Sequence, residues 1–270
     1  MKRYKKIVKA SSRIGERNKI KKYASRLLKV AVVVAIILGP IFVLRANFLQ
    51  IKNIEVVGGE ATLRDNINDT AYSFVRGNKF LFIPKSNILL LDEKDLAFAL
   101  SSQFTRIESV EVNKKLDKTV EISIKERASD FLWCRGEECF HMSKEGLVFS
   151  VFDESDDSLR AGKIIFRGGI EGDPIMKSFA IPEKMQDYLK MIETLKSFRL
   201  EVSALNIESV EKMVVDTNIG NIFLNPRDLD LSLSVQNAVT LIEEVKSKNP
   251  TAHFNYIDAR FGNKVFYKLY

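Results

Sequence analysis

The sequence predicts an α+β protein that has a single N-terminal transmembrane helix, a β-α-α-β-β region and then a β-rich region with helices. Three observations lead to this fold class. Residues 30–44 contain no charged side chain. The segments that follow alternate between apolar patterns of period two and of period 3.6, which are typical of strands and helices. Hydrophobic residues make up 46% of the chain and charged residues 29%, as in globular proteins.

The net charge of +7 is concentrated at the N-terminus. Residues 1–29 hold twelve Lys or Arg and a single acid, Glu16, so this segment carries +11. The remaining residues hold 30 basic and 34 acidic side chains, a net charge of −4. The basic character therefore belongs to a tail, and the body that follows is mildly acidic.

An apolar segment, VAVVVAIILGPIFVL, follows the basic tail. Leu27 and Leu28 extend it to about 18 residues, because Lys29 can direct its ammonium group toward lipid headgroups, and this is the lower end of what crosses a hydrocarbon core of roughly 30 Å. We expect residues 1–26 to be a basic cytoplasmic tail and residues 27–45 a transmembrane helix. The basic flank predicts a cytoplasmic N-terminus and an extracytoplasmic body.

Three alternatives compete with this interpretation. A cleaved signal peptide usually has a shorter basic part and a small-residue cleavage site, whereas Arg45 stands where cleavage would occur. A buried core helix would not adjoin eleven net positive charges. The basic tail could also bind nucleic acid, but attraction to anionic headgroups is the simpler explanation for basic residues beside a membrane span. We therefore expect membrane contact and no nucleic acid.

Residues 48–127 show the element order β-α-α-β-β. Alternating apolar positions predict the strands, and apolar faces with capping residues predict the helices. The expected elements are a strand at 51–56 before Gly58-Gly59, a helix capped by Thr62 and ended by Gly77, a connector broken by Pro84, a helix capped by Asp92, and strands from Ser109 and Thr119 around a turn at Asp117-Lys118.

The two cysteines, Cys134 and Cys139, lie in the segment WCRGEECF. Gly136 suits a tight turn that would place the two thiols opposite one another, and an extracytoplasmic location favours a disulfide. Free thiols are the main alternative. A metal site would need more ligands than these cysteines and His141 supply.

Residues 128–270 form the expected β-rich domain. The acidic segment 153–158 is expected to be a solvated loop, because its spacing does not suit a calcium site. The expected elements are a hairpin at 140–150 with Gly146 near its turn, a helix starting near Pro182, short strands at 200–225 with turns at Glu211-Lys212 and Gly220-Asn221, a helix from Asp230 to Lys248, and final strands at 253–261 and 264–270.

The segment VEVNKKLDKTVEISIKER resembles the end of a POTRA domain, and the whole order behind a membrane helix resembles bacterial cell-division proteins of the FtsQ/DivIB family. Asp117 departs from the family, which usually has proline in this turn. The ending around "I-D-x-R-F, turn, strand" is also similar to that family. The matching positions are Val110, Val112, Leu116, Val120, Ile122, Ile124, Glu126 and Arg127 in the first region, and Ile257, Asp258, Arg260, Phe261 and Gly262 in the second.

No motif for catalysis is recognisable, so we expect neither an enzyme nor a cofactor or metal. The chain has two histidines and lacks GxSxG, HExxH and P-loop patterns, which leaves no nucleophile–base pair or phosphate cradle. Asp258 and Arg260 lie two residues apart on one face of the expected strand, which favours a structural ion pair.

The resemblance implies a bitopic scaffold of the divisome at the septum, located in the bacterial inner membrane. Its partners would be small coiled-coil division proteins of the FtsB/DivIC and FtsL types, besides other divisome components. The family accepts a partner strand at its C-terminal strand by β-augmentation. The implied partner-binding residues are Phe261, Lys264, Val265, Phe266, Tyr267 and Lys268.

Three alternatives remain open at this point. The final strand could pair within its own sheet, with Lys264 and Lys268 as protective edge charges. The chain could serve protein secretion or outer-membrane assembly, where POTRA domains also occur, although a barrel needs a long series of alternating strands. An anchored cell-wall enzyme is a third class, which the absent motifs disfavour.

Overall fold

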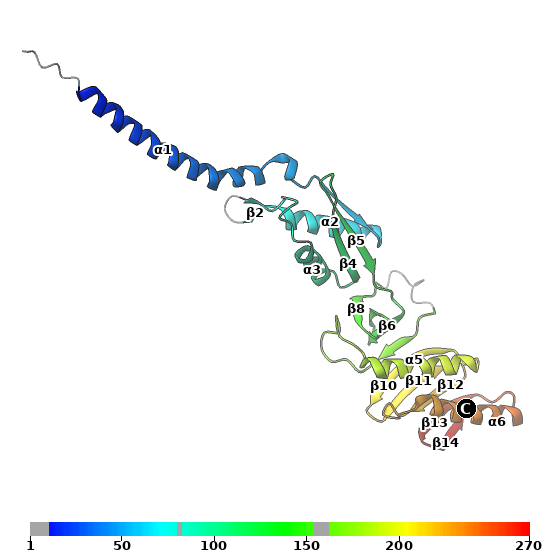
Figure 1. Cartoon of the computed structure of the whole chain (residues 1–270). Coiled ribbons are helices and arrows are strands. Elements are labelled where there is room, and N and C mark those ends of the chain that lie inside the picture. Colours follow the sequence, from blue (N-terminus) through cyan, green and yellow to red (C-terminus); the bar gives the residue numbers. More distant parts are fainter. Residues whose placement is uncertain (1–10, 80–82, 154–161) are drawn as a thin grey trace, which may run out of the picture. The chain divides into compact units, whose positions relative to one another are not determined.

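The computed structural model describes residues 11–79, 83–153 and 162–270 (Figure 1). It is a mixed α/β protein that divides into two compact units. Unit 1 comprises Met1–Leu100 and Val110–Ile124, and unit 2 comprises Ser101–Ser109 and Lys125–Tyr270. The expected acidic loop at 153–158 lies outside the described residues except for Asp153.

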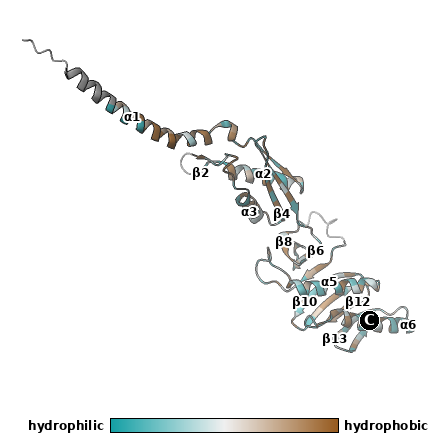
Figure 2. Ribbon diagram, in the orientation of Figure 1, coloured by the Kyte–Doolittle hydropathy of each residue, from teal (hydrophilic) through white to brown (hydrophobic). Residues whose placement is uncertain are grey.

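Helix α1 spans Ser11–Leu44 and contains Pro40. Its segment Lys22–Leu44 has 23 residues and is long and apolar enough to cross a membrane, and none of its 18 most apolar consecutive residues is buried inside the protein. At 1.5 Å per residue this segment is about 35 Å long, which exceeds the thickness of a hydrocarbon core. Figure 2 shows the hydrophobic band along this helix. The exposure of its side chains argues against a buried core helix.

Unit 1 is built on a three-stranded sheet of order β1-β5-β4. β1 (Asn53–Val57) pairs in parallel with β5 (Thr119–Glu126), and β4 (Ile107–Lys114) is the other neighbour of β5. Two helices, α2 (Ala61–Val75) and α3 (Glu93–Gln103), contribute buried apolar residues to this unit. A short 3₁₀ helix, η1 (Asn47–Leu49), and the two-residue strands β2 (Asn78–Lys79) and β3 (Ile83–Pro84) complete it.

The helix starts of unit 1 agree only in part with the expectation. Asp92 is confirmed as a cap of α3, because its Oδ1 accepts hydrogen bonds from the backbone N–H groups of Lys94 and Asp95. Thr62 is not the cap of α2. This helix begins at Ala61, so Glu60 is the residue at the cap position and Thr62 lies inside the first turn. Glu60 makes no side-chain capping bond, so burial of the apolar face rather than capping stabilises this start.

Unit 2 is built on a nine-stranded sheet of order β14-β13-β12-β11-β10-β9-β6-β7-β8. Consecutive strands in the chain are mostly neighbours, whereas β9 lies between β6 and β10 and pairs in parallel with both. The strands are β6 (Phe131–Arg135), β7 (Glu138–Met142), β8 (Val148–Val151), β9 (Ile165–Arg167), β10 (Val202–Ser209), β11 (Lys212–Thr217), β12 (Gly220–Leu224), β13 (Phe254–Phe261) and β14 (Lys264–Leu269).

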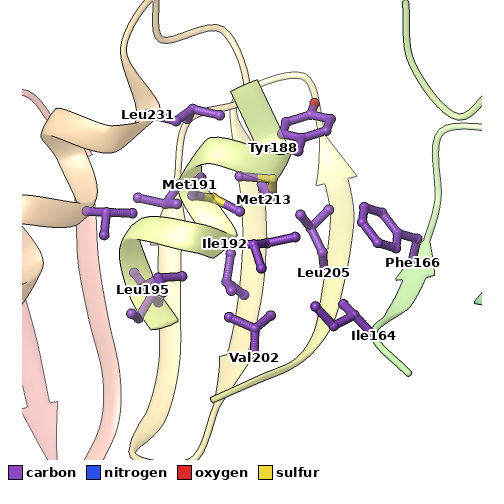
Figure 3. Packing of buried hydrophobic residues seen from close by; sticks show 14 of the residues in the cluster. Ile164, Phe166, Tyr188, Met191, Ile192, Leu195, Val202, Leu205, Met213 and Leu231 are labelled. Carbon is purple, nitrogen blue, oxygen red and sulfur yellow. The ribbon is translucent and has the colours of Figure 1, made fainter. Parts of the chain in front are cut away.

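Two helices, α5 (Pro182–Ser197) and α6 (Leu231–Lys248), cover one face of this sheet. Figure 3 shows side chains of α5, such as Met191 and Leu195, pointing toward apolar side chains of the strands. Asp230 caps α6 by accepting the backbone N–H of Leu233 at 3.1 Å, in agreement with the expected start. The main hydrophobic core of unit 2 therefore lies between the helices and the strands.

The two cysteines lie in register on neighbouring strands and form a disulfide bond, Cys134–Cys139. Both are buried, together with Leu132 and Phe152, in a small second core. Because both sulfurs are bonded to each other, they are neither free thiols nor metal ligands.

The turns between the short strands differ from the expected positions. Lys212 and Gly220 begin β11 and β12, so the turns lie one to two residues earlier than predicted. Gly220 has φ +135°, and a Cβ there would collide with the backbone carbonyl oxygen of Phe254. Glycine is required here for close approach to β13, not for a turn.

Candidate partner-binding edge

β14 is an edge strand of the nine-stranded sheet, with β13 as its neighbour among the described residues. The two strands are antiparallel and are joined by a short turn at Gly262, whose φ is +64°. Asn237 Nδ2 of α6 donates to the Gly262 carbonyl oxygen at 3.2 Å. The edge is thus supported by β13 on one side and by α6 at its turn.

The direction of the main-chain groups of β14 follows from one hydrogen bond. The Tyr270 N–H donates to the His253 carbonyl oxygen at 3.1 Å, so it points toward β13. At both register shifts of this pair the additional residue lies on β13, which leaves the alternation of β14 unbroken. Successive residues point their N–H and C=O groups to opposite sides. Val265, Tyr267 and Leu269 therefore direct theirs away from the sheet.

The side chains of β14 alternate between the two faces of the sheet. Val265 and Leu269 are half-buried and pack on the main core, on the helix-covered face. Tyr267 shares this parity, is 45% exposed and makes an edge-on contact with Phe254, with ring centroids 6.0 Å apart. Lys264 and Lys268 are exposed and point to the opposite face.

Phe266 anchors an aromatic and charged cluster on that opposite face. It is 54% exposed and packs edge-on against Phe261 at 5.6 Å. The Arg260 guanidinium lies 5.3 Å from the Phe261 ring centre and makes a two-pronged ion pair with Asp258, at 2.8 and 2.6 Å. The hydrogen bond from Arg260 to Asp258 raises the pKa of the guanidinium. The predicted structural ion pair is confirmed.

The same face carries residues that the sequence did not indicate. Phe223 of β12 stacks on Tyr256 of β13 at 5.2 Å, and the Lys212 ammonium lies 4.4 Å from the Phe223 ring centre. Phe223 is in register with Asp258, which is in register with Phe266. Residues in register share a face, so the cluster extends inward from the edge strand. Only the register of β12 against β13 reveals this, because α6 separates them in sequence.

The opposite edge of the sheet, β8, is partly covered by its own chain. The Val148 N–H donates to the Lys177 carbonyl oxygen at 2.9 Å, and the Met176 N–H donates to the Val148 carbonyl oxygen at 2.7 Å. Leu147 forms an isolated bridge with Ser178. Such covering is a common protection against unwanted strand pairing. Of the two sheet edges, β14 is the one that presents a run of outward main-chain groups among the described residues.

Comparison with known proteins adds no identification. No protein-family model and no curated protein matches the chain. Within the ranges that the structure describes, no group of three or more His, Cys, Asp or Glu side chains could hold a metal ion.

Proposed function

We propose that this chain is a single-pass scaffold of the bacterial divisome, of the FtsQ/DivIB type. In this proposal α1 crosses the inner membrane with the N-terminus in the cytoplasm. The part of unit 1 that follows α1, and all of unit 2, lie outside the cytoplasm at the division septum. The chain would recruit or stabilise septal division proteins through protein–protein contacts, without catalysis or a cofactor.

The element order of unit 1 supports the POTRA part of the proposal. Apart from the two-residue strands β2 and β3 between the helices, the elements along the chain are β1, α2, α3, β4 and β5, the order expected of that domain. Four of the matched apolar positions, Val112, Val120, Ile122 and Ile124, are buried in its core. The resemblance therefore coincides with residues that unit 1 needs for packing, whereas the matched Leu116 is exposed.

The outward edge of β14 is the observation that carries the binding role. Val265, Tyr267 and Leu269 direct main-chain N–H and C=O groups away from the sheet, to a side where no strand of the described part of the chain pairs with β14. Phe266 and Tyr267 add exposed aromatic surface beside these groups. An extended segment that pairs with this edge would gain main-chain hydrogen bonds, and alternate side chains would give specificity. Lys264 and Lys268 favour a segment with acidic residues.

Photo-crosslinking in dividing cells tests this function. A photoreactive amino acid replaces Phe266 on the outward edge of β14, which we call the docking edge. As a matched control it replaces Val151 instead, which is 68% exposed at the end of the opposite edge strand. Val265 is a poorer probe site because its side chain packs on the core. We expect the Phe266 probe, and not the Val151 probe, to capture a small single-pass coiled-coil protein.

Two results would overturn the proposal. Capture of barrel-assembly components or secreted clients would support the secretion role instead. If neither probe forms an adduct while the folded protein is present at its normal level, the edge of β14 has no partner.

A further inference from the structure

Three large apolar side chains are exposed at one end of unit 1. Phe48 lies in η1, Leu89 in the loop before α3, and Leu116 in the turn between β4 and β5. Their exposed fractions are 60%, 65% and 107%, respectively. Single exposed apolar residues are common on protein surfaces, so their shared location is what requires an explanation.

Hydrogen bonds fix the loop of Leu89 at the end of α1. The side-chain amide of Asn87, which is fully buried, donates to the carbonyl oxygen of Leu44 at 2.6 Å. Gln50 Nε2 donates to the same oxygen at 3.2 Å. Leu44 is the last residue of the segment that is suited to cross a membrane. Asn87 thus lies within one hydrogen bond of the point where that segment ends.

Further bonds hold the neighbouring chain at the same level. The Ile88 N–H donates to the Leu49 carbonyl oxygen at 2.8 Å, and the Leu89 N–H donates to Asn87 Oδ1 at 2.9 Å. Phe48 immediately precedes Leu49 in η1. Phe48 therefore lies in the segment that follows α1, and Leu89 is next to Ile88, whose N–H is hydrogen-bonded to that segment.

The turn of Leu116 lies at the end of the sheet where the chain enters β1. The Lys52 N–H donates to the Lys118 carbonyl oxygen at 3.0 Å, and Asn53, the first residue of β1, is in register with Thr119, the first of β5. Because β1 and β5 are parallel, both begin at the end of the sheet that adjoins α1.

Basic side chains accompany the three apolar ones. Arg45, Lys52 and Lys85 are exposed, and they are attached to the same connecting segments. Lys115 in the Leu116 turn is paired with Glu121 at 2.5 Å, and Asp117 accepts the Thr119 N–H. Apolar side chains with basic neighbours at the boundary of a membrane span suit the headgroup region of a bilayer that contains anionic lipid.

We propose that this end of unit 1 docks on the surface of the bilayer that α1 crosses. The apolar side chains enter the headgroup–acyl boundary, and the basic ones contact lipid phosphates. This inference requires α1 to span a membrane, but it does not depend on a role in cell division. The membrane-facing end consists of Phe48, Leu89 and Leu116 with Arg45, Lys52 and Lys85.

Depth-dependent quenching in lipid vesicles tests the proposal with the full-length chain. Because the two native cysteines are bonded to each other, a single added cysteine can be labelled with an environment-sensitive fluorophore. The probe sites are Leu89→Cys and Leu116→Cys. The matched control is Val57→Cys, which is 52% exposed in the same unit but lies about 13 Å further along β1 from Asn53.

We expect the probes at positions 89 and 116 to emit at shorter wavelength and to be quenched by lipids that carry a quencher near the headgroup. The probe at position 57 should emit as in water and resist quenching. Lys52→Glu with Lys85→Glu should reduce the quenching of the first two probes in vesicles that contain anionic lipid. Equal, water-like emission from all three probes would overturn the proposal, because full-length chains reconstituted in pure lipid have no protein partner to compete for this end.

Discussion

Replacing Tyr267 by proline or by alanine separates main-chain pairing at the docking edge from side-chain contact. Both substitutions remove the phenol ring and its contact with Phe254. Proline also removes the N–H and places its ring where that group pointed. Because the Tyr267 N–H faces away from β13, neither substitution removes a hydrogen bond of the sheet. Edge strands tolerate proline in such outward positions.

The expected difference in affinity follows from one lost hydrogen bond. A partner carbonyl that is buried at the interface and left without a donor costs about 1–3 kcal/mol, which is roughly 5- to 150-fold in Kd. Crosslinking yield from a probe at Phe266 should therefore fall further in the Tyr267→Pro background than in the Tyr267→Ala background. Thermal unfolding of the two purified variants should give similar midpoints.

Lys268→Pro provides the complementary control. Its N–H has the same parity as that of Tyr270 and so faces β13, and proline there should lower the unfolding midpoint. Equal crosslinking yields in the two Tyr267 backgrounds, with both proteins folded, would refute the assignment of the outward edge as the partner-binding element.

Three further predictions concern stability in unit 2. The Cys134–Cys139 disulfide closes a loop with a sequence separation of 5, so its reduction should lower the free energy of unfolding by about 2 kcal/mol on a loop-entropy basis. Denaturation with and without reductant measures this loss, and a Cys134→Ser/Cys139→Ser variant that still responds to reductant would contradict it. Gly262→Ala should lower the free energy of unfolding by about 1–2 kcal/mol for its left-handed conformation alone. Gly220→Ala should lower it by more, because the added Cβ also meets a backbone oxygen, and equal losses in urea unfolding would count against that reasoning. Burial raises the pKa of the Asp216 carboxyl above its ordinary value, so the folded state takes up its proton more readily than the unfolded state and the carboxylate is destabilising at neutral pH. Asp216→Asn should therefore raise the unfolding midpoint at pH 7, and this gain should shrink as pH falls through the raised pKa.

Local signals in the sequence predicted where the helices and strands lie better than they predicted which of these elements are neighbours in space. The helix from Pro182, the start of α6 after Asp230 and the cap at Asp92 all depend on residues within one turn of the helix. Such contacts can be read from spacing. The start of α2 could not be assigned, because Thr62 has the capping chemistry but burial decides where this helix begins.

The features that define the candidate edge depend on distant pairing. Strand order places β14 at the end of the sheet. Its sequence left this open, because Lys264 and Lys268 are compatible with an edge strand but do not establish one. The hydrogen bond from the Tyr270 N–H to the His253 carbonyl oxygen shows which groups of β14 point outward, because the extra residues on β13 leave the alternation of β14 unbroken. The stack of Phe223 on Tyr256 requires the parallel pairing of two strands that α6 separates.

If β14 binds a partner as proposed, the small size of this edge predicts that the partner is tethered in the same membrane as α1. Three outward residues offer at most six main-chain hydrogen bonds, worth about 3–9 kcal/mol at 0.5–1.5 kcal/mol each. Association costs an estimated 4–15 kcal/mol or more, so this edge alone would hold a free segment weakly. A partner tethered beside α1 binds at an effective concentration that can reach about the millimolar range. The aromatic and basic side chains around Phe266 would then select the partner segment, and tethering in the same membrane would compensate for most of the weak affinity of the edge.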